Sequence, residues 1–207
     1  MNKTFTIDHI QSALDAHSPN EQPSLDSERN AAVAIVLSEA PKGELAALFM
    51  QRAEHPLDPW SGQMSFPGGG VEDHDKTLKY ASMRETLEEV GLPLDDTHYM
   101  GRLHDQFAGR LKTHLLAVSP FVFYHPDPPP LVHNEEVADT VWVPLSYMVN
   151  PKNSVLFNTP LDPEGRAFPS FQYQHYTIWG LTYRMLRDFF ALLDMELPMD
   201  PELKKGN

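Results

Sequence analysis

Apolar residues in this chain occur in short runs that are separated by polar or proline-containing segments. The runs at residues 31–38 and 45–51 flank residues 41–43, which include a proline and a glycine, and together they predict an antiparallel hairpin. Three later runs are rich in the aromatic and β-branched residues that favour strands. They predict strands at residues 98–106, 113–124 and 137–143.

Two segments carry apolar residues at helical spacing. The first is residues 7–16, where Thr6 is placed to cap the helix. The mostly polar residues 18–30 that follow predict a linker. The second segment, residues 176–193, predicts a long helix near the end of the chain. Its apolar stripe consists of Ile178, Leu181, Met185, Phe189 and Leu192.

Helices around a mixed sheet predict an α/β, or α+β, layered architecture. A length of 207 residues suits one domain, and no shift in composition divides the chain convincingly. We therefore expect a single domain over residues 1–207. Within it, residues 1–30 form the N-terminal helix and linker, and residues 31–194 form the core.

The chain is acidic, with 16 Lys and Arg against 29 Asp and Glu and a formal net charge of −13. No basic cluster interrupts this surplus, so we expect no nucleic-acid partner. The absence of cysteine excludes disulfides, a thiolate nucleophile and a cysteine-based zinc site. No apolar run approaches the ~20 residues of a membrane span, and no secretory signal is visible, so we expect a cytoplasmic protein without a membrane partner.

The segment at residues 65–92 carries the residues that point to chemistry. Asp75 is placed to cap a helix that Gly91 would end. The apolar side predicted for this helix consists of Tyr80, Met83, Leu87 and Val90.

Glu85, Glu88 and Glu89 are spaced i, i+3 and i+4 on another side of the same helix, so we expect their carboxylates to converge. Three acids this close repel one another unless a cation lies between them, and a hard divalent ion, Mg²⁺ or Mn²⁺, suits their oxygen atoms. Arg84 lies four residues before Glu88 and can hold that carboxylate. The three glycines at residues 68–70 permit a tight turn and offer a backbone carbonyl toward the same metal.

This segment resembles the signature of the Nudix hydrolases, G-x5-E-x7-R-E-U-x-E-E-x-G-U, in which U is an aliphatic residue. The second half matches without gaps, through Arg84, Glu85, Glu88, Glu89, Gly91 and Leu92. Thr86 stands at the first aliphatic position. Counted from Gly70, Lys76 occupies the position of the loop glutamate. Counted from Gly69, the acid Asp75 occupies it, with eight residues rather than seven before the arginine.

The resemblance implies a Nudix-type α/β/α sandwich that hydrolyses a nucleoside diphosphate linked to another moiety, with Mg²⁺ or Mn²⁺. Glu85 and Glu89 then correspond to the principal metal ligands, and Glu88 to a third. Arg84 belongs to the same catalytic set. The general base is either Glu85 or a glutamate from a later loop. We expect Glu136, just before the last predicted strand, to be a supplementary metal ligand.

The residues before this signature resemble the coenzyme A pyrophosphatase branch, which carries L-L-T-x-R-[SA]-x3-R-x3-G-x3-[FL]-P-G-G. The matching residues are Arg52, Ala53, Gly62, Phe66, Pro67, Gly68 and Gly69. The second arginine of the branch falls at Leu57, and one residue is inserted before Gly62. Coenzyme A or an acyl-CoA is the leading substrate. ADP-ribose or a nucleotide sugar, which lacks the 3′-phosphate, is the alternative.

The substrate-binding residues that follow from this resemblance are Arg52, Gly68 and Gly69. Arg52 either binds a phosphate or is a surface arginine, and Trp60 either stacks on a base or packs within its loop. A different class of function is a non-catalytic module that binds a small nucleotide, although such modules typically lose the helix glutamates. An interaction role for the helix at residues 7–16 is compatible with catalysis and makes a homodimer a candidate assembly.

Overall fold

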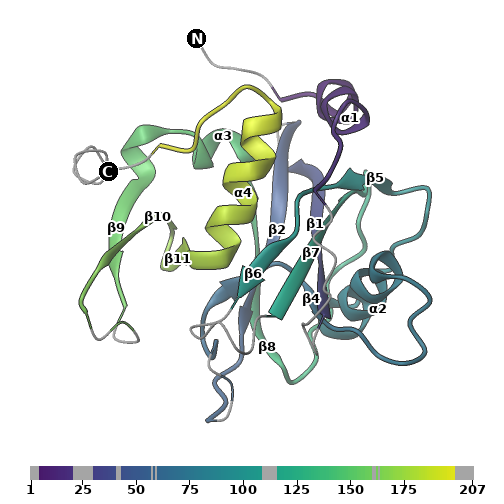
Figure 1. The fold of residues 1–207 in the computed structure, drawn as a ribbon, viewed down its shortest axis with the longest axis horizontal. Helices are drawn as coiled ribbons and strands as arrows, with labels where there is room; N and C mark the ends of the chain where they lie inside the picture. The colour runs from purple at the N-terminus through teal and green to yellow at the C-terminus, as the bar shows by residue number, and fades with distance from the viewer. Residues whose placement is uncertain are drawn as a thin grey trace.

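The computed structural model describes residues 5–20, 30–40, 43–56, 58, 60–108, 116–159, 162 and 164–198. The helices are α1 (Ile7–Asp15), α2 (Leu78–Val90), α3 (Leu145–Met148) and α4 (Gly180–Leu192), with a short 3-10 helix at Pro151–Asn153. The strands are β1 (Asn30–Ala40), β2 (Glu44–Arg52), β3 (Met64–Ser65), β4 (Gly68–Gly70), β5 (Tyr99–Arg102), β6 (Gln106–Ala108), β7 (Leu116–Tyr124), β8 (Val137–Pro144), β9 (Ser154–Asn158), β10 (Ala167–Tyr173) and β11 (Tyr176–Trp179) (Figure 1).

The larger of the two sheets is mixed. Its strands lie in the order β3-β2-β1-β7-β5, with β4 paired to β1, β6 to β7 and β8 to β2. β1 and β7 run parallel, whereas the other pairs are antiparallel. The predicted hairpin is present, because Leu37 of β1 pairs with Ala47 of β2 and Ala40 pairs with Glu44. Residues 41 and 42 of its turn lie outside the described residues.

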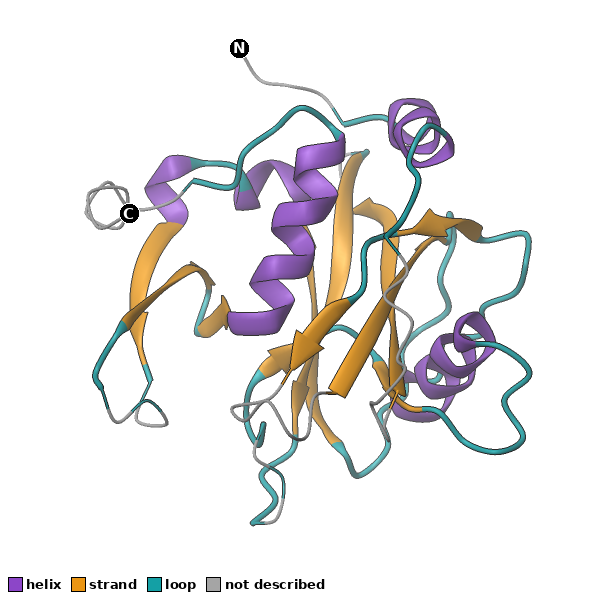
Figure 2. Ribbon diagram, viewed as in Figure 1, coloured by secondary structure: helices purple, strands orange, loops and turns teal. Residues whose placement is uncertain are grey.

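Helices cover both faces of this sheet, which confirms the α/β/α sandwich (Figure 2). Alternate residues of a strand point to opposite faces, and β1 shows this clearly. Its Ile35 and Leu37 join a large apolar core together with residues of α1 and α4. Its Ala32, Ala34 and Val36 join a smaller core together with residues of α2. β1 therefore lies at the centre of both layers.

The predicted N-terminal helix is confirmed as α1. Thr6 Oγ1 accepts a hydrogen bond from the backbone N–H of His9 at 3.3 Å and caps the helix. Ile10 and Leu14 are buried in the large core. Residues 21–29 of the predicted linker lie outside the described residues, and Asn30 already begins β1.

The predicted helix at residues 176–193 is wrong at its beginning. Tyr176–Trp179 form β11, which pairs with β10 in a second sheet of order β11-β10-β9, and α4 begins only at Gly180. Gly180 has a φ of 65°, a left-handed conformation that turns the chain from strand to helix. Four residues are too few for periodicity to separate strand from helix, so pairing with β10 decides the outcome.

The remaining strand predictions hold with changed boundaries. The strand predicted at residues 98–106 is two shorter strands, β5 and β6. The strand predicted at residues 113–124 is β7, whose described part begins at Leu116. β8 ends one residue beyond the prediction. β9 and β10 were not predicted, because one is short and the other contains a proline. No helix in the described part of the chain is long and apolar enough to cross a membrane.

Candidate active site

The helix with the three glutamates, α2, is capped by Thr77 rather than by Asp75. Thr77 Oγ1 accepts a hydrogen bond from Tyr80 N–H at 3.0 Å. The end of the helix is as predicted, since Gly91 has a φ of 67° and its N–H donates to Leu87 O. The prediction of Asp75 as the cap is therefore wrong, because a threonine two residues later supplies the same hydrogen bond.

The buried side of α2 also differs from the predicted apolar side. Tyr80 and Leu87 are 41% and 52% exposed. The residues that α2 buries are Ala81, Ser82, Thr86, Glu89 and Val90. The orientation follows from what lies beneath the helix: β1 presents small alanines there, and the backbone N–H of Gly68 binds the carboxylate of Glu89. α2 thereby directs Glu85 and Glu89 toward the glycines of β4.

Arg84 joins the loop before α2 to the acids of the helix. Its Nε and Nη2 donate to the two carboxylate oxygens of Asp75 at 3.0 and 2.9 Å, and Nη2 also donates to Gly70 O at 3.0 Å. Its Nη1 donates to Glu85 Oε1 at 3.0 Å and to Glu88 Oε2 at 2.9 Å. The contact with Glu88 is the i, i+4 pair that the sequence predicts.

Asp75 is the acid that holds Arg84, a role that the sequence analysis missed. Its side chain is buried and also accepts a hydrogen bond from Glu72 N–H at 2.8 Å. The hydrogen bonds from Arg84 hold the pKa of Asp75 below its ordinary value, and Asp75 in turn raises the pKa of Arg84. A bidentate pair of this kind fixes the guanidinium plane. The available signal was the count from Gly69, which places an acid at the loop position of the signature.

Glu89 is buried between α2 and the sheet. It is 2% exposed, and its Oε2 accepts a hydrogen bond from Gly68 N–H at 2.7 Å. Burial raises the pKa of Glu89 to about 8, and the charges of Glu85 and Glu136 act in the same direction. The bond from Gly68 and the charge of Arg52 oppose this increase only in part. Burial is therefore the main reason that Glu89 holds its proton more strongly than a solvated glutamate.

Glu85 lies against β4. A Cβ atom at Gly69 would lie 2.6 Å from Cδ and Oε1 of Glu85, so a side chain there would displace this carboxylate. Burial raises the pKa of Glu85, whereas Arg84 lowers it, and the charges of Glu88 and Glu136 raise it further. Glu85 is thus held in place by an arginine and crowded by other acids.

Gly68 and Gly69, predicted to bind substrate, shape the space around the two carboxylates. Gly68 has a φ of 150°, and a Cβ there would lie 2.3 Å from Ala32 O of β1. This close approach brings the N–H of Gly68 to the carboxylate of Glu89. Any direct contact of these glycines with substrate stays a prediction.

Glu136 reaches the site from the loop before β8. Its carbonyl accepts a hydrogen bond from Ala53 N–H at 2.8 Å, and its N–H donates to Asn134 Oδ1 at 2.9 Å. Its side chain is exposed, and its charge raises the pKa of both Glu85 and Glu89. The structure therefore brings Glu136 within electrostatic reach of the helix acids. Its role as a metal ligand stays a prediction.

Arg52 lies at the end of β2, and Trp60 lies in the loop that follows. Arg52 is close enough to Glu89 to lower its pKa. Its Nε donates to Asp58 Oδ2 at 2.7 Å, an ion pair that the sequence analysis did not predict. Asp58 Oδ1 also accepts a hydrogen bond from Trp60 N–H at 2.9 Å. Trp60 is 42% exposed, so part of its ring surface is open to solvent.

The carboxylates fit a divalent cation that is held partly by substrate. In the described part of the chain, no three Asp, Glu, His or Cys side chains are grouped so that they could hold a metal ion, so the predicted convergence of Glu85, Glu88 and Glu89 is wrong. Arg84 instead binds one oxygen of Glu85 and one of Glu88. Mg²⁺ is usually bound by one or two protein carboxylates together with substrate phosphates, so Glu85 and Glu89 are a sufficient donor set.

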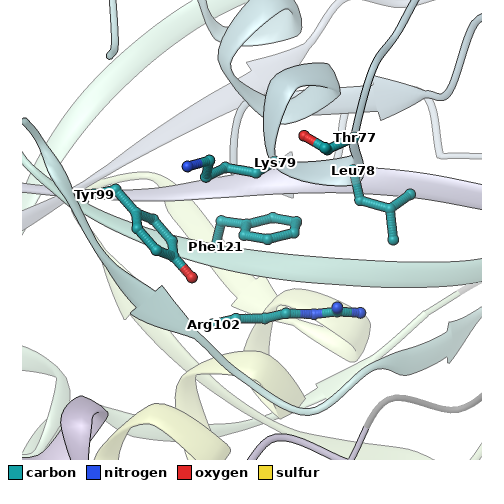
Figure 3. A pocket seen from close by; sticks show the side chains of 6 residues that line it. All are labelled: Thr77, Leu78, Lys79, Tyr99, Arg102 and Phe121. Atoms are coloured by element: carbon teal, nitrogen blue, oxygen red, sulfur yellow. The ribbon is translucent and has the colours of Figure 1, made fainter. Parts of the chain in front are cut away.

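A separate recess of about 370 Å³ lies between the beginning of α2 and strands β5 and β7. Figure 3 shows Lys79 and Arg102 beside the rings of Tyr99 and Phe121. Lys79 Nζ lies 4.6 Å from the Tyr99 ring centre, and Arg102 Cζ lies 5.4 Å from that of Phe121. Each cation is also paired with a neighbouring aspartate. None of the predicted site residues lines this recess.

An α/β/α sandwich in which the helix on one face, α2, carries three glutamates and an anchored arginine defines a class of hydrolase. The family model of the NUDIX domain matches residues 28–163, a range that includes all the predicted site residues. The chain therefore belongs to the Nudix hydrolase family. Enzymes of this family generally use divalent metal ions.

Two bacterial relatives are similar over nearly their whole length. A protein described as "Uncharacterized Nudix hydrolase NudL" from Cronobacter sakazakii is 29% identical over 194 residues, which span 90% of this chain and 94% of the relative. Its counterpart from Salmonella paratyphi B is 31% identical over 191 residues, 89% of this chain and 93% of the relative. The crystal structure of a MutT/nudix family protein from Enterococcus faecalis aligns with a TM-score of 0.57 at 14% identity, over 93% of this chain and 76% of that one. This last likeness concerns the fold.

Proposed function

We propose that this enzyme hydrolyses the pyrophosphate bond of a small nucleoside diphosphate derivative, with Mg²⁺ or Mn²⁺ as its cofactor. The observation that carries the proposal is the pair Glu85 and Glu89. Both carboxylates face the glycines of β4, and both have a raised pKa. Two crowded acids repel an anionic substrate unless cations lie between them. A bound divalent ion neutralises phosphate charge and makes hydroxide available at neutral pH.

Each acidic residue has a distinct part in this proposal. Glu85 and Glu89 hold the metal, and Glu88, which pairs with Arg84, and the exposed Glu136 are further candidate ligands that would have to move toward it. Arg84 positions Glu85 through its bidentate contact with Asp75. A carboxylate must also accept the proton of the attacking water. Glu85 and Glu136 are the candidates for this base.

Coenzyme A or an acyl-CoA is the candidate that the sequence motif favours. This candidate rests on the match through Arg52, Ala53 and Gly62 and on the run from Phe66 to Gly69. Arg52 also lies near Glu89, as a phosphate-binding residue of this site should.

A nucleoside diphosphate derivative without an additional phosphate, such as ADP-ribose or a nucleotide sugar, is the second candidate. The observation that favours it is the ion pair between Arg52 and Asp58. Because the arginine already has a carboxylate partner, it offers less net charge to the 3′-phosphate of coenzyme A. The partly exposed ring of Trp60 is a surface on which a base can stack.

A substrate comparison by mass spectrometry tests the reaction. The panel is coenzyme A, 3′-dephospho-coenzyme A, ADP-ribose, a nucleotide sugar, a dinucleoside polyphosphate and a nucleoside triphosphate. Each is incubated with Mg²⁺, with Mn²⁺ or with a chelator, and Glu89→Gln is the matched control. We expect cleavage at the pyrophosphate only with metal and only by the wild type. Equal cleavage in the chelator, or none on any substrate, would contradict the proposal.

A further inference from the structure

The loop between β2 and β3 brings an acid to the arginine beside Glu89. Arg52 Nε and Asp58 Oδ2 are 2.7 Å apart, and the two side chains are only 26% and 15% exposed. The second oxygen of Asp58 accepts the N–H of Trp60. Both carboxylate oxygens are therefore engaged, one by the arginine and one by the loop itself.

Hydrogen bonds within the loop hold Asp58 in this position. Asp58 N–H donates to His55 O at 3.1 Å, and Ser61 N–H donates to Asp58 O at 3.1 Å. Gly62 has a φ of 71°, and a Cβ there would lie 2.4 Å from the carboxylate of Glu54. Glycine at this position allows the loop to close tightly. The contact of Asp58 with Arg52 is thus supported on both sides of the aspartate.

Asp58 changes the charge that the site presents to substrate. Arg84 is bonded to Asp75, Glu85 and Glu88, whereas Arg52 lies outside that network and lowers the pKa of Glu89 through its charge. The ion pair with Asp58 offsets part of the charge of Arg52. An additional phosphate monoester carries almost two negative charges at neutral pH, so it would have to displace Asp58 or approach it against like charge.

We propose that Asp58 is a specificity-determining residue: by holding Arg52 in an internal ion pair, it makes the enzyme discriminate against nucleoside diphosphate derivatives that carry an additional phosphate monoester. The inference rests on the proposed function and names the substrate class of the same site. Diphosphates without that phosphate are the preferred substrates. The discrimination acts through Arg52 rather than through the metal ligands.

A double-mutant cycle tests the inference. The variants are Asp58→Asn, Arg52→Gln and the double variant, and the readout is the ratio of kcat/KM for coenzyme A to that for 3′-dephospho-coenzyme A. The two substrates differ only in the phosphate monoester, so a merely structural effect of the substitution cancels. We expect Asp58→Asn to raise the ratio about tenfold, the scale of one charge-assisted hydrogen bond. In the Arg52→Gln background the same change should have no effect.

The matched control is Glu54→Gln, which removes one negative charge from the same loop but bonds Ser61 rather than Arg52. It should leave the ratio unchanged. An unchanged ratio in Asp58→Asn, or an equal increase with and without Arg52, overturns the inference. Melting temperatures of all variants identify any that fail to fold.

A binding measurement separates this inference from the proposed function. Calorimetry compares adenosine 3′,5′-bisphosphate with AMP on the wild type and on Asp58→Asn, without turnover. A selective gain for the bisphosphate in Asp58→Asn supports the inference even if no pyrophosphate is cleaved. The same preference between the two nucleotides in the variant as in the wild type, or no binding of either, overturns it. Failure of the proposed function alone appears as the absence of cleavage throughout the substrate panel.

Discussion

The two faces of the large sheet bury different kinds of residue. On the face covered by α4, the fully buried side chains are large and apolar, and Phe189 and Phe190 pack edge to face with ring centres 5.4 Å apart. On the face covered by α2, alanines of β1 lie beneath a helix that buries Thr86 and Glu89. Apolar burial stabilises the fold on both faces, because Leu48, Met50 and Phe123 are also buried in the core on the α2 side, but this second face in addition holds acids whose charges repel one another. The chemistry is thus placed on the α2 side of the sheet.

The largest effect should come from removing charge on the α2 face. We expect Glu85→Gln and Glu89→Gln each to lower kcat by roughly 10²–10⁴, the range for a lost electrostatic or acid–base group. Folding should be unaffected or improved in the absence of metal, because crowding of like charges is relieved. Steady-state kinetics at saturating Mg²⁺ and thermal melts in a chelator measure the two quantities. Near-normal turnover in both variants would refute the site assignment.

The corresponding change on the α4 face should act on stability alone. Phe189→Ala removes a fully buried ring, and we expect the free energy of unfolding to fall by about 3–5 kcal/mol. The kcat of the molecules that remain folded should be close to the wild-type value. Urea unfolding followed by circular dichroism, together with activity per folded molecule, gives both numbers. A large loss of kcat in fully folded protein would show that the faces are not separable.

A smaller loss of activity is expected from a substitution at Gly69, which lies against the carboxylate of Glu85. The Cβ of Gly69→Ala would lie 2.6 Å from the Glu85 carboxyl group, so the carboxylate must move. A displacement of about an ångström lowers rates by roughly tenfold to a hundredfold. Gly70→Ala is the control, because a Cβ there meets no atom within 4 Å. The comparison is kcat for the two variants, and equal losses would count against a positional role for Gly69.

The smallest effect is on stability, and it concerns a polar contact of Tyr176, which is buried in the same core as α4. Tyr176 Oη donates to Asp139 Oδ2 at 2.5 Å and joins β11 to β8. This bond lowers the pKa of Asp139 below its ordinary value, so its contribution to stability is present above about pH 4 and is lost as the pH falls through the lowered pKa. We expect Tyr176→Phe to reduce the free energy of unfolding by about 1 kcal/mol at pH 7. The deficit should shrink near pH 3, and chemical denaturation at both values tests this sign.

Much of the site was predictable because its signals are local. The spacing of Glu85, Glu88 and Glu89, and the pairing of Arg84 with Glu88, follow from the period of a helix. The glycine run before the helix can be read directly from the residue types at positions 68–70. The fold class followed in the same way, from the alternation of apolar runs and helical stripes. Whether Glu88 and Glu136 are metal ligands remains a prediction.

The sequence by itself therefore determined the class of fold, the acidic helix and the family to which the chain belongs. Only the tertiary structure decided how α2 is rotated, because that depends on the alanines of β1 and on the N–H of Gly68, both distant along the chain. It also decided the partners of Asp75 and Asp58, each an arginine selected by loop geometry rather than by spacing on a helix. The strand at Tyr176–Trp179 was settled in the same way, since hydrogen bonding to β10 outweighs a periodicity that four residues cannot define.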